Sequence, residues 1–171
     1  LPGAILMLTE LSLYVQFRPG RIDHHGPQIA LFMLTLAGAV TESLWGATLA
    51  GVATGLGLAV GLESMIFAVA VGAFFPLAFI VNSGDDGRRM ARYGAAIALT
   101  TAAAFLIQTP PWRWSVVACD AIGANLAAAV FVAGVGLFAA ARRVGARDWR
   151  WRLGALVVAG AVAAAVYVVL N

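Results

Sequence analysis

Six runs of apolar residues, separated by short polar segments, dominate the sequence after residue 26. A membrane-spanning helix needs about 20 apolar residues, because the hydrocarbon core of a bilayer is about 30 Å thick. Only 11% of the residues are charged, whereas soluble domains carry about a quarter. We therefore predict an all-α fold, a polytopic helical membrane protein with six to seven membrane segments. The runs cover residues 27–41, 47–61, 64–81, 94–108, 121–141 and 153–170, and the apolar stretch 1–17 is the seventh candidate.

The arginines predict how the chain is oriented. All eleven basic residues are arginines, and eight of them lie in two segments, residues 82–93 and 142–152. Basic residues are concentrated in cytoplasmic loops, so both segments are expected on the cytoplasmic side of a bacterial inner membrane. Two apolar runs separate the segments, which is consistent with both lying on one side. The polar loop before residue 27, Glu63 and the loop 109–120 are then expected on the periplasmic side.

Composition limits the classes of molecule that the protein is expected to bind. The net charge of +3 does not indicate nucleic acid, because the arginines lie in short loops without an aromatic-interleaved basic patch. Membrane lipid is the expected surrounding. The lone Cys119 excludes an intrachain disulfide and a cysteine-based zinc site. The chain begins with Leu, so we expect residues 1–171 to be a single transmembrane domain of a longer protein.

Both histidines fall in one polar segment, residues 18–27, directly before the first apolar run. Polar groups beside a membrane helix are costly and tend to be kept for function. The two prolines in the segment favour extended backbone before them, and alternate side chains of an extended chain point the same way. We therefore expect Asp23 and His25 to face one external cavity, with His24 turned away or bonded to the protein scaffold.

A carboxylate together with an imidazole suits Mn²⁺ or Zn²⁺ and, less well, Mg²⁺. Asp23 and His25 are accordingly candidate metal ligands, with Mn or Mg as the expected cofactor. Arg18 and Arg21 carry forked donors that match phosphate oxygens. Glu63 lies between two apolar runs and is expected near the same cavity, as a third ligand or as a partner of an arginine. The alternative is that the polar loop only anchors and solvates the membrane surface.

The second apolar run, residues 47–61, contains two pairs of glycines four residues apart, Gly51 with Gly55 and Gly57 with Gly61. Small residues at this spacing let membrane helices approach closely. We therefore predict that this run is buried among other helices, with its glycines at close contacts.

The eight residues 21–28, with the sequence RIDHHGPQ, resemble the Asp-His-His motif of oligosaccharyltransferase catalytic subunits, membrane glycosyltransferases of the GT-C class. The resemblance implies that Asp23 and His25 coordinate a catalytic divalent metal in an external loop. Residues 55–63 resemble a small-residue helix that follows two spans later in many GT-C proteins. The acceptor-covering external loop and the C-terminal Trp-Trp-Asp domain of that family are not found in these residues, so the resemblance implies a fragment or a reduced relative.

The leading hypothesis is a GT-C glycosyltransferase that takes a sugar from a polyprenyl-phosphate-linked donor on the periplasmic side. In this hypothesis the metal neutralises the departing phosphate, Arg18 and Arg21 contact that phosphate, and Glu63 is a supporting catalytic carboxylate. The alternative is a transporter or an assembly subunit, in which the loop is a gate and Glu63 is a proton or ion site. The oligomeric state does not follow from the sequence.

Overall fold

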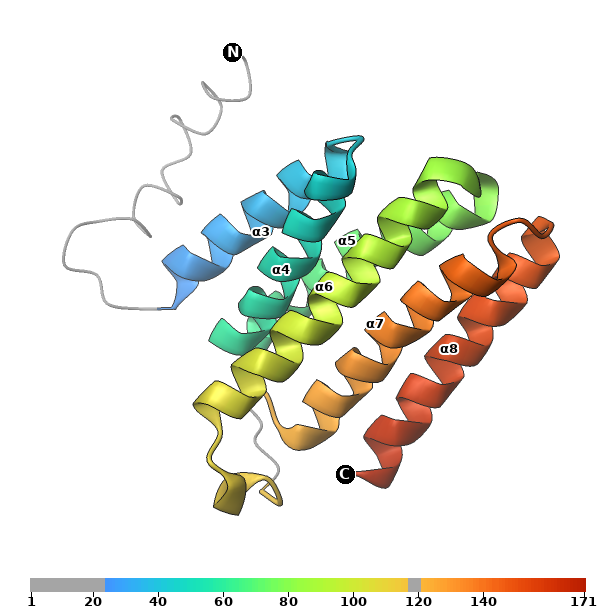
Figure 1. Ribbon diagram of the computed structural model, residues 1–171. Coiled ribbons are helices and arrows are strands. Elements are labelled where there is room, and N and C mark those ends of the chain that lie inside the picture. Colours follow the sequence, from blue (N-terminus) through green and yellow to red (C-terminus); the bar gives the residue numbers. More distant parts are fainter. Residues whose placement is uncertain (1–23, 117–120) are drawn as a thin grey trace, which may run out of the picture.

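The computed structural model describes residues 24–116 and 121–171, and every regular element in these ranges is helical (Figure 1). This confirms the predicted all-α class. Arg18, Arg21 and Asp23 lie outside the described residues, as does the apolar stretch 1–17. The elements are α3 (His25–Val40), α4 (Leu44–Val60), η1 (Leu62–Ser64), α5 (Met65–Val81), α6 (Gly84–Gln108), η2 (Pro111–Arg113), α7 (Ala124–Val144) and α8 (Trp149–Val169).

Within residues 24–116 and 121–171, four helical segments are long and apolar enough to cross a membrane, namely Leu62–Val81, Gly84–Gln108, Ala124–Val144 and Trp149–Val169. The helices α3 and α4 are apolar but have only 16 and 17 residues. At 1.5 Å per residue they measure about 24 to 26 Å, which is less than the hydrocarbon core of about 30 Å. The protein is thus a multi-pass helical membrane protein, and the part of the chain that the structure describes holds four candidate spans and two shorter apolar helices.

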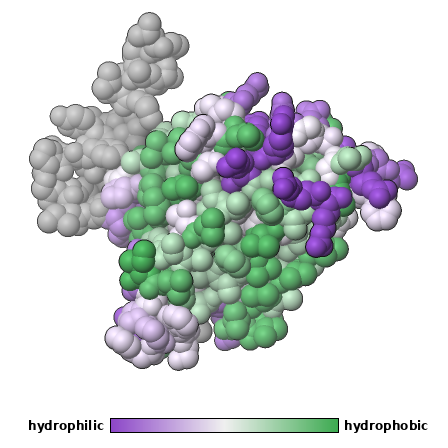
Figure 2. Space-filling view, viewed as in Figure 1, coloured by the Kyte–Doolittle hydropathy of each residue, from purple (hydrophilic) through white to green (hydrophobic). Residues whose placement is uncertain are grey.

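Successive helices run in opposite directions, so the turns alternate between two ends of the bundle (Figure 1). We call one the arginine end; it holds the α3–α4, α5–α6 and α7–α8 turns. The other, the histidine end, holds the start of α3, η1 and η2. This alternation agrees with the predicted separation of the arginine-rich segments from Glu63. Figure 2 shows hydrophilic side chains gathered at the arginine end above a hydrophobic band.

One predicted loop is wrong. The polar residues of the segment 82–93 belong largely to α6, which begins at Gly84 and continues to Gln108. Acidic side chains stabilise the first turn of a helix, and here Asp85 pairs with Arg88 while Asp86 pairs with Arg89 across a single turn. The helix therefore extends well beyond its apolar part.

The basic connector predicted over residues 142–152 is also shorter than expected. The last turn of α7 includes Arg142 and Arg143. Asp148 caps α8, because its Oδ1 accepts hydrogen bonds from the backbone N–H groups of Arg150 and Trp151 at 3.1 and 3.3 Å. A side-chain acceptor at this position satisfies backbone donors that have no partner within the helix. Only a short turn remains between the two helices.

The helix α6 lies between α4 and α7 and contacts both through small residues. A Cβ atom on Gly51 of α4 would lie 2.6 Å from the carbonyl oxygen of Tyr93 in α6. A Cβ atom on Gly94 of α6 would lie 2.5 Å from the carbonyl oxygen of Gly134 in α7. Such separations leave no space for a side chain, so these glycines set the distances between the helix axes.

The prediction for the second apolar run is confirmed in part. A Cβ atom on Gly55 would lie 2.9 Å from Thr100 Cβ in α6, so Gly51 and Gly55 both lie at close helix contacts. Gly57 is different, because a Cβ atom there would meet only Ser64 Oγ, at the ordinary contact distance of 3.6 Å. The run is thus tightly packed over most of its length and looser toward the histidine end.

Two buried arginines join helices at the arginine end. Arg89 Nη2 donates to the carbonyl oxygens of Ala39 at 2.7 Å and Thr41 at 3.4 Å, where α3 ends. Arg152 Nη1 donates to the carbonyl oxygen of Phe79 at 2.6 Å, in the last turn of α5. The last carbonyls of a helix have no partner within it, so each arginine satisfies such a group and ties a long helix to a neighbour.

Candidate metal centre

The first turn of α3 places both histidines at the histidine end of the bundle. His24 has helical backbone angles, and the backbone N–H of Gln28 donates to its carbonyl oxygen at 3.1 Å. The extended conformation predicted for this stretch is therefore wrong from residue 24 onward. Gly26 precedes Pro27, and because glycine has no Cβ it avoids part of the clash that normally keeps such a residue out of the helical region.

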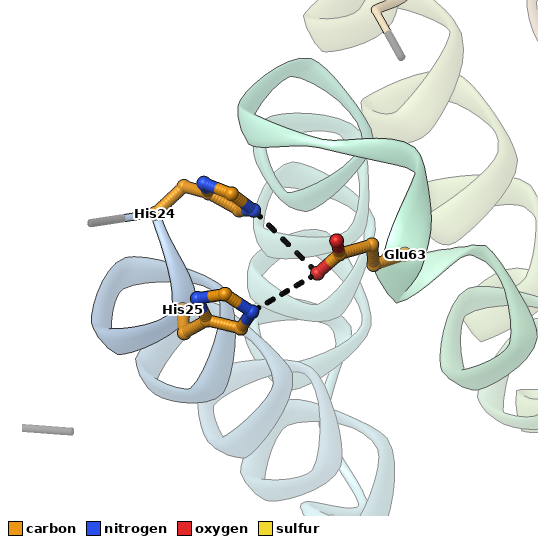
Figure 3. A group of neighbouring side chains, drawn as sticks. All are labelled: His24, His25 and Glu63. Carbon is orange, nitrogen blue, oxygen red and sulfur yellow. Dashed lines mark ion pairs between the residues drawn. The ribbon is translucent and has the colours of Figure 1, made fainter. Parts of the chain in front are cut away.

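The two imidazoles converge on one carboxylate from η1 (Figure 3). Glu63 Oε2 lies 3.5 Å from His24 Nε2 and 3.3 Å from His25 Nε2. The two rings are stacked, with centroids 4.5 Å apart. The side chains of His24 and His25 are 49% and 42% exposed and that of Glu63 is 63% exposed, so the cluster is open to solvent.

These three side chains could hold a divalent metal ion. Each of the three side chains offers one ligand atom, and these atoms lie within 4.8 Å of one another. Donors bound about 2.1 Å from a shared ion lie roughly 3.0 to 3.4 Å apart, close to the separations from Glu63 Oε2 to the two imidazole nitrogens. Two imidazoles suit a transition metal better than Mg²⁺, so of the two expected ions Mn²⁺ is the better match.

An apolar cavity of about 290 Å³ lies directly beside the cluster, between α3 and the start of α5. The Phe32 and Phe67 rings line it and contact each other, with centroids 4.6 Å apart. Apolar side chains therefore lie directly beside the His24, His25 and Glu63 cluster. The lining residues are His25, Gln28, Ile29, Phe32, Met33, Glu63, Ser64 and Phe67.

Gln28 is a site residue that the sequence analysis did not single out. It is 7% exposed, lines the cavity, and its Nε2 has no hydrogen-bond partner in the part of the chain that the structure describes. Gly61 leaves room for this amide, since a Cβ atom at that position would lie 2.6 Å from Gln28 Nε2. The available signal was its spacing, because residues three apart share one face of a helix and Gln28 follows His25 by three.

The predicted site residues divide into three groups. Glu63 and His25 lie together at the cavity, as predicted. His24 contacts the same carboxylate, so it is bonded to the scaffold rather than turned away, and it becomes an additional candidate ligand. Asp23, Arg18 and Arg21 lie outside the described residues, and their proposed roles stay predictions.

No family model, curated protein or solved structure matches this chain. The fold and composition define the class, which is a polytopic helical membrane protein. The likeness to GT-C proteins rests on the local motifs at residues 21–28 and 55–63.

Proposed function

We propose that the protein is a metal-dependent membrane glycosyltransferase of the GT-C class that uses a polyprenyl-phosphate-linked sugar donor. The observation that carries this proposal is the convergence of His24, His25 and Glu63 beside an apolar cavity. A site that acts on a lipid-linked phosphate needs a bound cation at the membrane surface, which neutralises the phosphate. It also needs an apolar space directly below, which receives the lipid. We place the histidine end on the periplasmic side of a bacterial inner membrane, following the arginine distribution.

In this proposal His25, Glu63 and Asp23 hold the divalent metal, with His24 as a further donor. Such an ion neutralises negative charge on a departing phosphate. Arg18 and Arg21 bind phosphate oxygens with their forked donors. Glu63 is also the supporting carboxylate for the acceptor, because its exposed side chain is accessible from the aqueous side.

The cavity orients the lipid part of the donor. Phe32, Phe67 and Ile29 provide the apolar walls, which contact the first prenyl units and exclude water from the phosphate. Gln28 Nε2 donates a hydrogen bond to a phosphate or sugar oxygen, which satisfies a buried donor that the described residues leave without a partner. A buried amide is unfavourable without such a bond, so its position favours a polar ligand group at this point.

Metal binding tests the site directly. Electron paramagnetic resonance of Mn²⁺ titrated with the purified protein measures the dissociation constant. Replacing His25 with Ala or Glu63 with Gln should weaken binding at least about tenfold, since even outer-shell changes at metal sites cost this much. The matched control is Glu42→Gln, an exposed carboxylate at the arginine end, which should leave the constant unchanged.

The same titration separates two versions of the ligand set. The resemblance assigns the metal to Asp23 and His25, whereas the geometry adds His24. If His24→Ala binds Mn²⁺ more weakly than the unaltered protein, His24 is a metal ligand. If its binding is unchanged, the ligands are Asp23, His25 and Glu63 without His24. Unchanged binding by Asp23→Asn, His24→Ala, His25→Ala and Glu63→Gln together would contradict a metal site here.

Turnover tests the reaction. With Mn²⁺, a polyprenyl-phosphate-linked sugar and a hydroxyl acceptor, or water in its place, the purified protein should transfer the sugar to the acceptor oxygen and release polyprenyl phosphate, and Glu63→Gln should lose this release. Metal-dependent ion flux in liposomes without donor cleavage would instead support the transporter alternative.

A further inference from the structure

A second cavity, of about 650 Å³, lies at the arginine end between the start of α6 and the end of α7. Three arginines line it, Arg88 and Arg92 from α6 and Arg142 from α7. Residues four apart share one face of a helix, so the two arginines of α6 face the cavity together. Apolar side chains complete the wall, among them Leu44 and Phe138. We call this cavity the basic groove.

The positive charge of the basic groove is only partly balanced. Arg88 pairs with Asp85. Across residues 24–116 and 121–171, no carboxylate lies within ion-pair distance of Arg92 or Arg142. The guanidinium of Arg142 lies 5.7 Å from the centroid of the Phe138 ring, a contact that leaves its charge available. The groove therefore presents two uncompensated cations.

The positions of these arginines along their helices place them near the headgroup layer of a membrane. Arg88 and Arg92 are four and eight residues after the start of α6 at Gly84, which is about 6 and 12 Å along the helix axis. Arg142 lies in the last turn of α7. The polar layer on each side of the hydrocarbon core is about 5 to 8 Å thick. Counted from Gly84, Arg88 therefore lies within one such thickness and Arg92 lies one turn deeper, at the level of the first part of the acyl chains.

We propose that the basic groove binds an anionic phospholipid, with its phosphate between Arg92 and Arg142. Charge complementarity selects a headgroup with net negative charge, because two cations without carboxylate partners face the groove. The apolar wall formed by Leu44, Phe138 and Ala95 continues toward the hydrophobic band and receives an acyl chain. A free phosphate ion would leave this wall uncovered. Basic pockets between membrane helices are known to bind anionic headgroups in this way. This site is independent of the metal centre at the other end.

Native mass spectrometry of the purified full chain in a neutral detergent, titrated with phosphatidylglycerol, tests the proposal. The unaltered protein should bind phosphatidylglycerol in preference to phosphatidylcholine, which carries no net charge. Arg92→Gln and Arg142→Gln should each weaken binding about fivefold, and the double variant more strongly, as expected for loss of a cation near the membrane surface. Arg147→Gln is the matched control, because this exposed arginine does not line the groove.

Three results would overturn the proposal. Equal weakening by Arg147→Gln would show attraction by total charge rather than by the groove. Displacement of bound lipid by millimolar inorganic phosphate would show that the ligand is a free anion. Equal binding of phosphatidylcholine would show that charge does not select the lipid. The variants exchange exposed side chains that make no described ion pair, and unchanged melting temperatures would confirm that they fold.

Discussion

The two ends of the bundle use polar side chains in opposite ways. At the arginine end, Arg89 and Arg152 are buried, and their guanidinium groups donate to backbone carbonyls of α3 and α5. At the histidine end, the polar cluster of His24, His25 and Glu63 is exposed and converges on one point. The first set holds helices together, whereas the second set leaves imidazole and carboxylate atoms accessible to solvent.

The packing of α3 against α4 also differs between the two ends of the bundle. At the arginine end, a Cβ atom on Gly46 of α4 would lie 2.7 Å from the carbonyl oxygen of Gly38 in α3. Toward the histidine end, Gly57 has no atom closer than an ordinary contact and Gln28 lies buried without a partner for its amide. Between α3 and α4, backbone therefore meets backbone at the arginine end, whereas at the histidine end the close contact of Gly61 is with the Gln28 side chain beside the smaller cavity.

The largest effect should come from Arg89→Met. This change leaves the Asp86 carboxylate and the carbonyl oxygen of Ala39 without their donor, and removing one partner of a buried ion pair costs about 3–5 kcal/mol of the free energy of unfolding. The melting temperature in detergent should fall steeply.

Arg88→Met is the matched control for this prediction. Arg88 is the preceding residue and also pairs with an aspartate, but its side chain is 72% exposed, and exposed pairs contribute at most about 1 kcal/mol. Equal losses of stability for the two variants would show that the buried ion pair of Arg89 contributes no more than the exposed pair of Arg88.

The sequence predicted the helices of the fold but not their boundaries at the arginine end. Apolar runs locate helices in a membrane protein, so each of the six runs was correctly assigned to a helix and the turns alternate as predicted, but only four of these helices are long enough to span a membrane. Asp85 to Arg89 were assigned to a loop because they are polar, yet the pairs they form across one turn continue α6. All arginines carry the same charge, so the sequence alone does not distinguish the buried Arg89 and Arg152 from the exposed Arg92.

The candidate site was predicted only in part, because its assembly depends on tertiary contacts. The proximity of Glu63 to His25 was predicted, because the alternation of the apolar runs places both residues at the same end of the bundle. The contact of His24 with Glu63 did not, since it requires the helical turn that starts α3. Gln28 was overlooked because one amide in an apolar run carries little signal until a cavity is seen beside it.

A smaller effect is expected from Gly46→Ala, which tests the difference in packing between the ends. Its new methyl group would approach the carbonyl oxygens of Gly38 and Thr41 at 2.7 and 2.8 Å. Overpacking of this kind costs about 1–3 kcal/mol, so the melting temperature should fall. Gly57→Ala is the control within the same helix, and because alanine favours helix by up to about 1 kcal/mol, its melting temperature should hold or rise. A fall at Gly57 as large as that at Gly46 would remove the distinction in packing.

A still smaller effect on stability, with the opposite sign, is expected from Gln28→Leu. Leucine has a similar size and removes a buried amide without a described partner, so the free energy of unfolding should rise by up to about 1 kcal/mol. Affinity for the lipid-linked donor should fall at the same time, which can be measured by donor titration. Gln108→Leu, at an exposed glutamine that ends α6, should change neither quantity. A clear loss of stability in Gln28→Leu would assign that amide to the fold rather than to the site.

The smallest effect in the absence of metal is expected from Glu63→Gln. The side chain is 63% exposed, and exposed substitutions usually change the free energy of unfolding by less than about 0.5 kcal/mol. A ligand that binds only the folded state stabilises it by about 2.7 kcal/mol at a concentration one hundred times its dissociation constant. Mn²⁺ should therefore raise the melting temperature of the unaltered protein and of Glu42→Gln, but raise that of Glu63→Gln far less. If Glu63→Gln melts lower than its parent without metal, and Mn²⁺ raises both melting temperatures equally, then Glu63 holds η1 against α3 as a structural tie. In that case the two ends of the bundle would no longer differ in how they use their charged groups.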